Sequence, residues 1–174
     1  MPNDPYHANP IIPAKFERFT AWKAGRNGAI AERVGAVEFI DFKVADNILA
    51  GIEMSLTQDV VDGYAKVFGG LIVGKTANSP SALDNASPHG IISPRSENFT
   101  IDGASFFNYD WNSAAALGDC SHCFHGAATD SGARTVTTRN LAFDAATVTK
   151  RIKYQYPKRG IYHDEDGSLT GQGA

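Results

Sequence analysis

Four clusters of apolar and β-branched residues recur along the chain, and each cluster ends in a corner of small or polar residues. The clusters span residues 35–44, 64–74, 99–109 and 135–143. Near-alternation of apolar and polar residues, clear around Val37 and Phe39, is typical of strands. Comparable positions in successive clusters lie 31, 34 and 36 residues apart, at Phe42, Val73, Phe107 and Phe143. This loose period predicts a repeat of short strands.

An all-β solenoid, the parallel β-helix, accounts for such a repeat. A single coil cannot bury its inward face alone, so coils stack and the strands of successive coils pair in parallel. A β-sandwich is the alternative, but in a sandwich turn signals recur about every 8 to 12 residues. The stretches 75–90 and 111–131 are longer and fit loops between coils, and only 57–63 and 113–117 favour short helices.

The prolines divide the chain into two parts. Residues 1–20 hold four prolines, which remove backbone donors and predict an irregular lead-in. Residues 21–174 are predicted to form the coils, as part of a longer solenoid. The apolar column of a solenoid needs cover at both ends. We therefore expect flanking β-helix coils or neighbouring subunits as partners.

Composition narrows the function classes. Hydrophobic residues make up 43% of the chain and charged residues 20%, with a net charge of −3. A chain of this composition can form a hydrophobic core and carries no excess of positive charge, so nucleic acid is not an expected partner. No apolar run approaches the roughly 20 residues that cross a bilayer, so no membrane-spanning segment is expected.

Three motifs resemble a known family. They are Phe19-Thr-Ala-Trp22, the run from Gly35 through Phe39 and Phe42 into Ala50-Gly-Ile-Glu53, and Asp164-Glu-Asp-Gly-Ser-Leu-Thr-Gly171. Together they resemble the parallel β-helix segments of fibrocystin-L-like proteins, which are related to the cell-surface hyaluronidases and the cell-migration-inducing hyaluronan-binding proteins. The resemblance implies a right-handed parallel β-helix with long loops. It also implies an extracellular or ciliary cell-surface location, within the ectodomain of a larger protein.

The densest chemical cluster is Cys120-Ser-His-Cys123-Phe-His125. Structural zinc usually needs two ligand pairs separated by a longer segment, and ligands this close in sequence cannot all reach one ion. The family resemblance implies a disulfide between Cys120 and Cys123, as expected in an oxidising compartment. Free thiols and a soft metal site are the alternatives.

Two further motifs concern modification and metal binding. Asp164 and Asp166 precede Gly167, where carboxylates could hold calcium or could cap the backbone of an Asp-Gly turn. The turn is the preferred interpretation, because the spacing departs from that of an EF-hand, and calcium is the only cofactor considered. Asn85 and Asn98 each begin an Asn-x-Ser/Thr acceptor for N-glycosylation.

Candidate catalytic and binding residues are few. Polysaccharide cleavage needs two carboxylates that face one groove, and Asp102 and Asp144 in successive clusters are the pair to consider. A basic-aromatic stretch could hold an acidic polysaccharide or could guard an edge strand, and the guard is preferred. Its residues are Lys150, Arg151, Lys153, Tyr154 and Tyr156. Trp22, Tyr109 and Trp111 are either platform residues or caps of the apolar column.

The sequence therefore predicts a non-catalytic structural and interaction module that presents a rigid face to glycans or protein partners. One alternative is a polysaccharide-cleaving enzyme similar to the hyaluronidases, which rests on analogy between folds. Another is a self-assembling filament or surface-coat subunit, since open solenoid ends expose unpaired strands.

Overall fold

The computed structural model describes residues 12–32, 36–55, 64–94, 98–118, 134–153 and 160–172. Parallel strands in three sheets dominate it. Sheet A contains β1 (Ala14–Glu17), β4 (Ala36–Ile40), β7 (Tyr64–Phe68), β10 (Phe99–Asp102), β13 (Arg134–Arg139) and β16 (Gly160–Asp164). Sheet B contains β2 (Thr20–Trp22), β5 (Lys43–Ala45), β8 (Leu71–Val73), β11 (Ser105–Phe107) and β14 (Ala142–Asp144). Sheet C contains β3 (Asn27–Glu32), β6 (Ala50–Ser55), β9 (His89–Ile92), β12 (Ala115–Gly118) and β15 (Ile152–Lys153).

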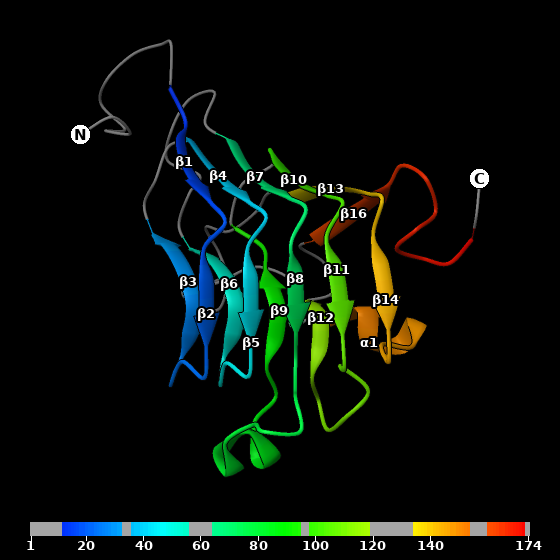
Figure 1. The fold of residues 1–174 in the computed structure, drawn as a ribbon. Coiled ribbons are helices and arrows are strands. Elements are labelled where there is room, and N and C mark those ends of the chain that lie inside the picture. Colours follow the sequence, from blue (N-terminus) through cyan, green and yellow to red (C-terminus); the bar gives the residue numbers. More distant parts are fainter. Residues whose placement is uncertain are drawn as a thin grey trace, which may run out of the picture.

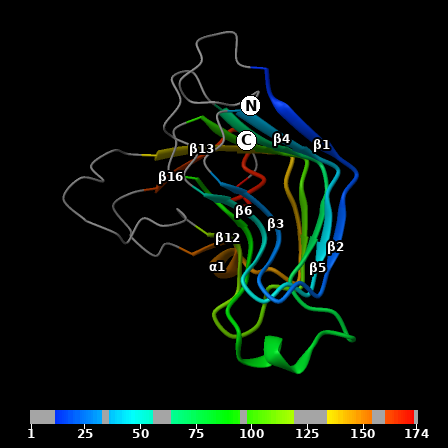
Figure 2. The ribbon, with the colours of Figure 1, turned by 90° about the vertical axis from the view of Figure 1, so that its left-hand side faces the viewer.

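Neighbouring strands within each sheet are three strands apart along the chain. The chain therefore visits sheets A, B and C in turn and then returns to sheet A one strand further along (Figure 1). Figure 2, turned by 90°, places sheet A at the top, sheet B at the right and sheet C on the third side. The prediction of an all-β protein with parallel pairing is confirmed, and the arrangement is consistent with a parallel β-helix.

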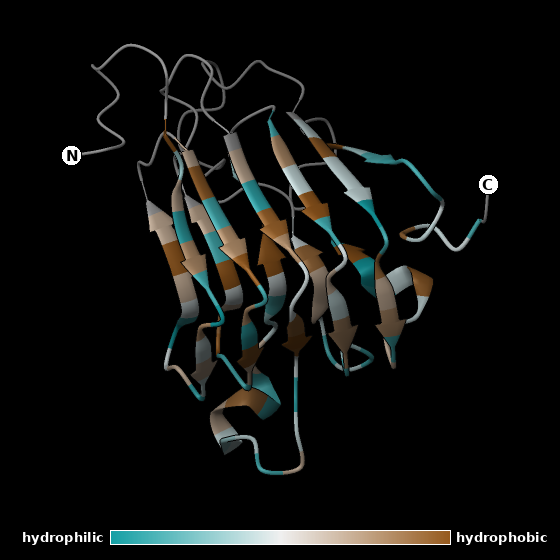
Figure 3. Cartoon of the chain, turned by 45° about the horizontal axis from the view of Figure 1, so that its top comes forward, coloured by the Kyte–Doolittle hydropathy of each residue, from teal (hydrophilic) through white to brown (hydrophobic). Residues whose placement is uncertain are grey.

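Columns of side chains in register build the core. In sheet B, the inward column runs through Ala21, Val44, Ile72, Phe106 and Phe143. In sheet C, another column joins Ala29, Ile52, Ile91, Leu117 and Ile152. One cluster of buried residues includes members of all three sheets. Hydrophobic and hydrophilic positions alternate along the strands (Figure 3), as expected for strands with one buried face.

Left-handed backbone marks each corner between sheets A and B. The residue that follows the sheet A strand has φ between 52° and 75° in all five coils that have such a corner, at Arg18, Asp41, Gly69, Gly103 and Asn140. Glycine, asparagine and aspartate adopt this conformation most readily, and Arg18 is the exception. The small and polar corners expected from the sequence are therefore sharp turns between sheets.

Among the described residues, two short helices lie outside the sheets. The 3-10 helix η1 (Ser81–Asn85) precedes β9, and α1 (Val148–Arg151) precedes β15. Residues 113–117, predicted as a helix, instead enter β12, whose Ala115 and Leu117 pair with His89 and Ile91 of β9. Strand pairing with β9 thus overrides the helix propensity of the alanines. The other helix prediction, 57–63, lies outside the described residues.

Three further predictions differ from the structure. Strand β1 lies within residues 1–20, where irregular backbone was expected, and it pairs with β4 because Pro13 precedes the strand rather than interrupting it. Strands β9 and β12 begin within stretches expected to be loops. The predicted repeat positions are out of register in three coils, since the column that contains Phe143 runs through Phe106, Ile72 and Val44. These residues lie one before Phe107, one before Val73 and two after Phe42.

Candidate interaction surface

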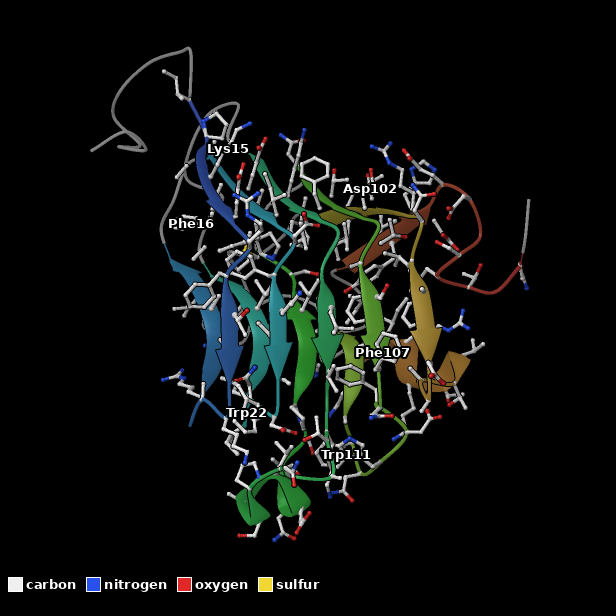
Figure 4. All side chains as sticks on the ribbon, viewed as in Figure 1. Lys15, Phe16, Trp22, Asp102, Phe107 and Trp111 are labelled. Carbon is white, nitrogen blue, oxygen red and sulfur yellow. The ribbon has the colours of Figure 1, made fainter. Side chains whose placement is uncertain are left out.

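The outer face of sheet B presents exposed aromatic, aliphatic and cationic side chains. We call this face the sheet B surface, and it faces the viewer in Figure 1. Its residues form two rows in register. One row is Thr20, Lys43, Leu71, Ser105 and Ala142, and the other is Trp22, Ala45, Val73, Phe107 and Asp144. Trp22 is 58% exposed and Leu71 is 39% exposed. Figure 4 shows Trp22 and Phe107 on this face, at different strands.

Trp22 is held in place by a buried carboxylate. Its indole Nε1 donates to Oδ2 of Asp46 at 2.9 Å, and Asp46 has no exposed surface. Thr76 donates to the same carboxylate from its backbone N at 2.7 Å and from Oγ1 at 2.6 Å. The Nζ atom of Lys23 lies 4.2 Å from the centre of the Trp22 ring. The exposed indole therefore has a fixed orientation and a cation beside it.

Trp111 occupies the same end of the sheet B surface, after β11. Its Nε1 donates to the Asn108 carbonyl at 3.0 Å, and the Asn108 side chain donates to the Lys75 carbonyl at 2.9 Å. The Nζ atom of Lys75 lies 5.2 Å from the Trp111 ring and 2.5 Å from a carboxylate oxygen of Asp84. The indole packs against the core cluster, whereas Trp22 is exposed. Tyr109 is buried among core residues, and burial raises the pKa of its hydroxyl.

The candidate catalytic pair is divided between two sheets. Asp102 ends β10 of sheet A, and Asp144 ends β14 of sheet B, where it pairs in register with Phe107. Oδ2 of Asp102 accepts from Nε of Arg139 at 2.8 Å, and Oδ1 accepts from Nδ2 of Asn140 at 2.8 Å. These hydrogen bonds lower the pKa of Asp102, with that from Asn140 the larger cause. Asp102 is thus an ionised partner of neighbouring side chains.

Asp164 and Asp166 hold backbone amides of the turn that follows β16. Asp164 accepts from Leu169 N at 3.2 Å and from Thr170 N at 2.8 Å. Asp166 accepts from Ser168 N at 3.0 Å and from Asn140 N at 2.7 Å. The hydrogen bonds from Ser168 and Asn140 lower the pKa of Asp166 to about 2. Within the described part of the chain, no group of three or more His, Cys, Asp or Glu residues is placed to hold a metal ion.

The basic residues near the C-terminal end donate to backbone carbonyls. Lys150 donates to the Asn112 carbonyl, and Lys153 donates to the Ser113 carbonyl at 3.2 Å. Arg151 donates from Nη1 to the Leu169 carbonyl at 2.7 Å, and its guanidinium lies 4.4 Å from the ring centre of Phe143. Tyr154 and Tyr156, the aromatic part of this predicted stretch, lie outside the described residues.

The remaining predicted positions are partly described. Asn85 ends η1 and is exposed, and Asn98 is exposed immediately before β10. Cys120 and Cys123 lie outside the described residues. No helix in the described ranges has the length and apolar character that crossing a membrane requires.

The sequence did not single out His89, a buried polar residue of β9. Neither ring nitrogen has a hydrogen-bond partner within the described residues, and the residue is 6% exposed. Burial, with a smaller contribution from the charge of Lys153, lowers the pKa of His89 to about 4. No signal in the sequence marks His89 as buried, since it follows a proline in a stretch that predicts a loop.

Comparison with known proteins supports the family resemblance. The chain is 27% identical over 168 residues to fibrocystin-L of Homo sapiens and 27% identical over 169 residues to fibrocystin-L of Mus musculus. These alignments cover 91% and 92% of this chain but only 4% of each relative. No family model matches the chain. No solved structure matches it either. The resemblance to fibrocystin-L that the sequence motifs indicated is confirmed, and it extends over nearly the whole chain.

Proposed function

We propose that the chain is a non-catalytic structural and interaction module of a cell-surface protein. In this proposal the three sheets close into a right-handed parallel β-helix, and the sheet B surface is the face presented to glycans or protein partners. The supporting observation is Trp22, which is 58% exposed although its indole is fixed by the buried Asp46 carboxylate. An exposed aromatic ring whose orientation is fixed loses little entropy when a partner binds.

The cell-surface location is supported by the similarity to fibrocystin-L along almost the full chain. A non-catalytic role is supported by Asp102, whose carboxylate already pairs with Arg139 and Asn140. A surface of stacked parallel strands is rigid because each strand is hydrogen-bonded to its neighbours in the coils on both sides. Such a surface suits adhesion or spacing better than catalysis that depends on moving loops.

The test is binding of the complete chain to immobilised glycans and to a panel of cell-surface protein ectodomains. We expect a partner whose affinity falls at least tenfold in Trp22→Ala and also falls in Lys43→Glu. Val148→Ala is the matched control, because Val148 is 59% exposed on α1, which packs against β12 and β15 of sheet C. Equal affinity of Trp22→Ala and Val148→Ala for every partner found would overturn the assignment of this surface.

A further inference from the structure

The two ends of the stack of coils are built differently. At the end formed by β1, β2 and β3, Phe16 is 52% exposed and Phe19 is 49% exposed. At the other end, Leu169 is 1% exposed and Arg151 lies over the ring of Phe143. We infer that the first end is the docking end and that it receives a further β-helix coil from an upstream segment of a longer polypeptide. This inference rests on the proposed function and adds which end of the module joins further coils.

Backbone hydrogen bonds between coils follow a rule at the corner between sheets A and B. The corner N–H of each coil donates to the last strand carbonyl of the following coil. The bonds run from Arg18 to Ile40 at 2.8 Å, from Asp41 to Phe68 at 2.8 Å, from Gly69 to Asp102 at 2.7 Å and from Gly103 to Arg139 at 3.1 Å. The equivalent acceptor in the first coil is the Glu17 carbonyl, which is in register with Ile40. It would accept from the corner N–H of a preceding coil.

Regular backbone hydrogen bonds also join neighbouring coils at both ends of the sheet B strands. The first N–H of each strand donates to the preceding coil, from Lys43 to Phe19 at 2.9 Å, from Leu71 to Phe42 at 2.8 Å and from Ser105 to Gly70 at 3.0 Å. The equivalent donor in β2 is the Thr20 N–H. The last carbonyl of β5 accepts from Lys23 N at 3.0 Å, and its equivalent in β2 is the Trp22 carbonyl. Within the described residues, none of these three first-coil groups has a backbone partner from a preceding coil.

Side chains replace the missing coil at the opposite end. The corner N–H of Asn140 donates to the Asp166 carboxylate at 2.7 Å, where earlier coils use a strand carbonyl. The next amide, Leu141 N, donates to Ser168 Oγ at 3.0 Å. Arg151 adds a hydrogen bond to the Leu169 carbonyl and covers Phe143, the last ring of the sheet B column. Side chains thus cover the corner and the sheet B column at this end, which argues against head-to-tail stacking of copies.

The aromatic stack at the open end indicates what the added coil must carry. Phe16 stacks on Phe39 with ring centres 5.7 Å apart, and Phe19 lies 5.2 Å from Phe42. Each ring thus has an inner neighbour in the next coil and an exposed outer face. The occupant needs parallel strands with apolar residues at these two positions. The segment that forms this coil must be about as long as the 23 residues that separate Ala14 from its partner Val37.

The test adds a copy of one coil to either end of the complete chain. A copy of residues 36–63 is inserted between Ile12 and Pro13. In the chain these residues lead into Tyr64, which pairs with Ala36, and Pro13 occupies the equivalent position just before β1, so the added coil continues into β1. We expect the melting temperature to rise by several degrees and the Thr20 amide to become protected from hydrogen exchange. The same residues added after Ala174 are the matched control and should produce neither effect.

Two variants separate docking from unspecific stabilisation. The N-terminal extension with its copied Phe39 changed to Asp should lose the gain, because the inward position over Phe16 becomes charged. Equal melting temperatures for the two fusions, or an unprotected Thr20 amide in the N-terminal fusion, would overturn the inference. A stable dimer of the unmodified chain that Phe16→Asp dissociates would also overturn it, since the occupant would then be a second copy. These results do not depend on binding at the sheet B surface, so either proposal can fail alone.

Discussion

At the scale of single residues, His89 couples stability to pH. Its pKa is about 4 in the folded chain and 6.5 in the unfolded chain, because burial disfavours the charged ring. The unfolded state therefore binds a proton between these values while the folded state does not. Stability is full above pH 6.5 and falls as the pH decreases toward 4.

We expect His89→Leu to lose most of this pH dependence. Between pH 7 and pH 5 the histidine should account for about 2 kcal/mol of the decrease in unfolding free energy. Urea unfolding of both proteins at the two pH values measures it. His163→Asn serves as the control, since His163 is exposed at the outer side of β16. A pH slope that is the same in His89→Leu and the parent chain would contradict the prediction.

Asp166 is the second residue whose charge matters. Its carboxylate accepts the Asn140 and Ser168 amides, and these bonds hold its pKa at about 2. A depressed carboxyl pKa contributes stability that is present above the ordinary value of 3.8 and is lost as the pH falls through 2. Asp166→Ala should therefore lower the melting temperature at pH 7, whereas millimolar calcium should leave that of the parent chain unchanged. A clear rise with calcium that EDTA reverses would show instead that the turn binds the metal.

At the scale of elements, small residues in sheet C make room for large ones in sheet B. A Cβ atom on Gly90 would lie 2.4 Å from the Ala116 carbonyl and 3.0 Å from Phe106, and one on Gly51 would lie 2.8 Å from Val44. We expect Gly90→Ala to cost about 1–3 kcal/mol of unfolding free energy, because neither backbone nor core can move away. Gly25→Ala is the matched control, since nothing lies within 4 Å of its added Cβ. Equal denaturation midpoints for the two variants would refute this packing argument.

The charged residues at the carboxyl ends of the sheet A strands provide a test of the enzymatic alternative. Arg139 joins Asp102 of β10, at 2.8 Å, to Glu165 after β16, at 3.0 Å. The three side chains are 21% to 43% exposed, so water screens these ion pairs and Asp102→Asn should cost less than about 1 kcal/mol. We expect neither the parent chain nor Asp102→Asn to shorten a polysaccharide during long incubation, as judged by size-exclusion chromatography. Cleavage by the parent that Asp102→Asn or Asp144→Asn abolishes would establish the enzyme instead.

At the scale of the whole molecule, an exported module should meet the glycosylation machinery. Asn85 and Asn98 are both exposed, and Asn85 lies in η1, away from the strands. Secretion of the chain from cells that glycosylate should add sugar at Asn85, and Asn85→Gln should remove the corresponding mass. Intact mass before and after deglycosylation measures this, with Asn78→Gln as a control because Asn78 begins no acceptor triplet. An unmodified mass after secretion would weaken the proposed location.

The strand clusters were predictable because each depends on local patterning. Val44, Ile72 and Phe106 lie in three of the four apolar clusters and form one column. Which residue of each strand points into the core was harder to predict, because pairs such as Ile72-Val73 and Phe106-Phe107 offer two apolar residues in succession. Only the packing against Gly51 and Gly90 of sheet C decides which residue of each pair points inward.

The sequence by itself determined an all-β chain with parallel, repeating strands, since the repeat and its polar corners are local properties. The tertiary structure decided the rest. Sheet C contains short, glycine- and alanine-rich strands such as β9 and β12, which form because neighbouring coils pair with them. The position of Asp102 beside Arg139, the fixing of Trp22 by Asp46 and the difference between the two ends all join residues more than 20 apart in sequence. Such contacts exist only once coils have stacked, and no local pattern encodes them.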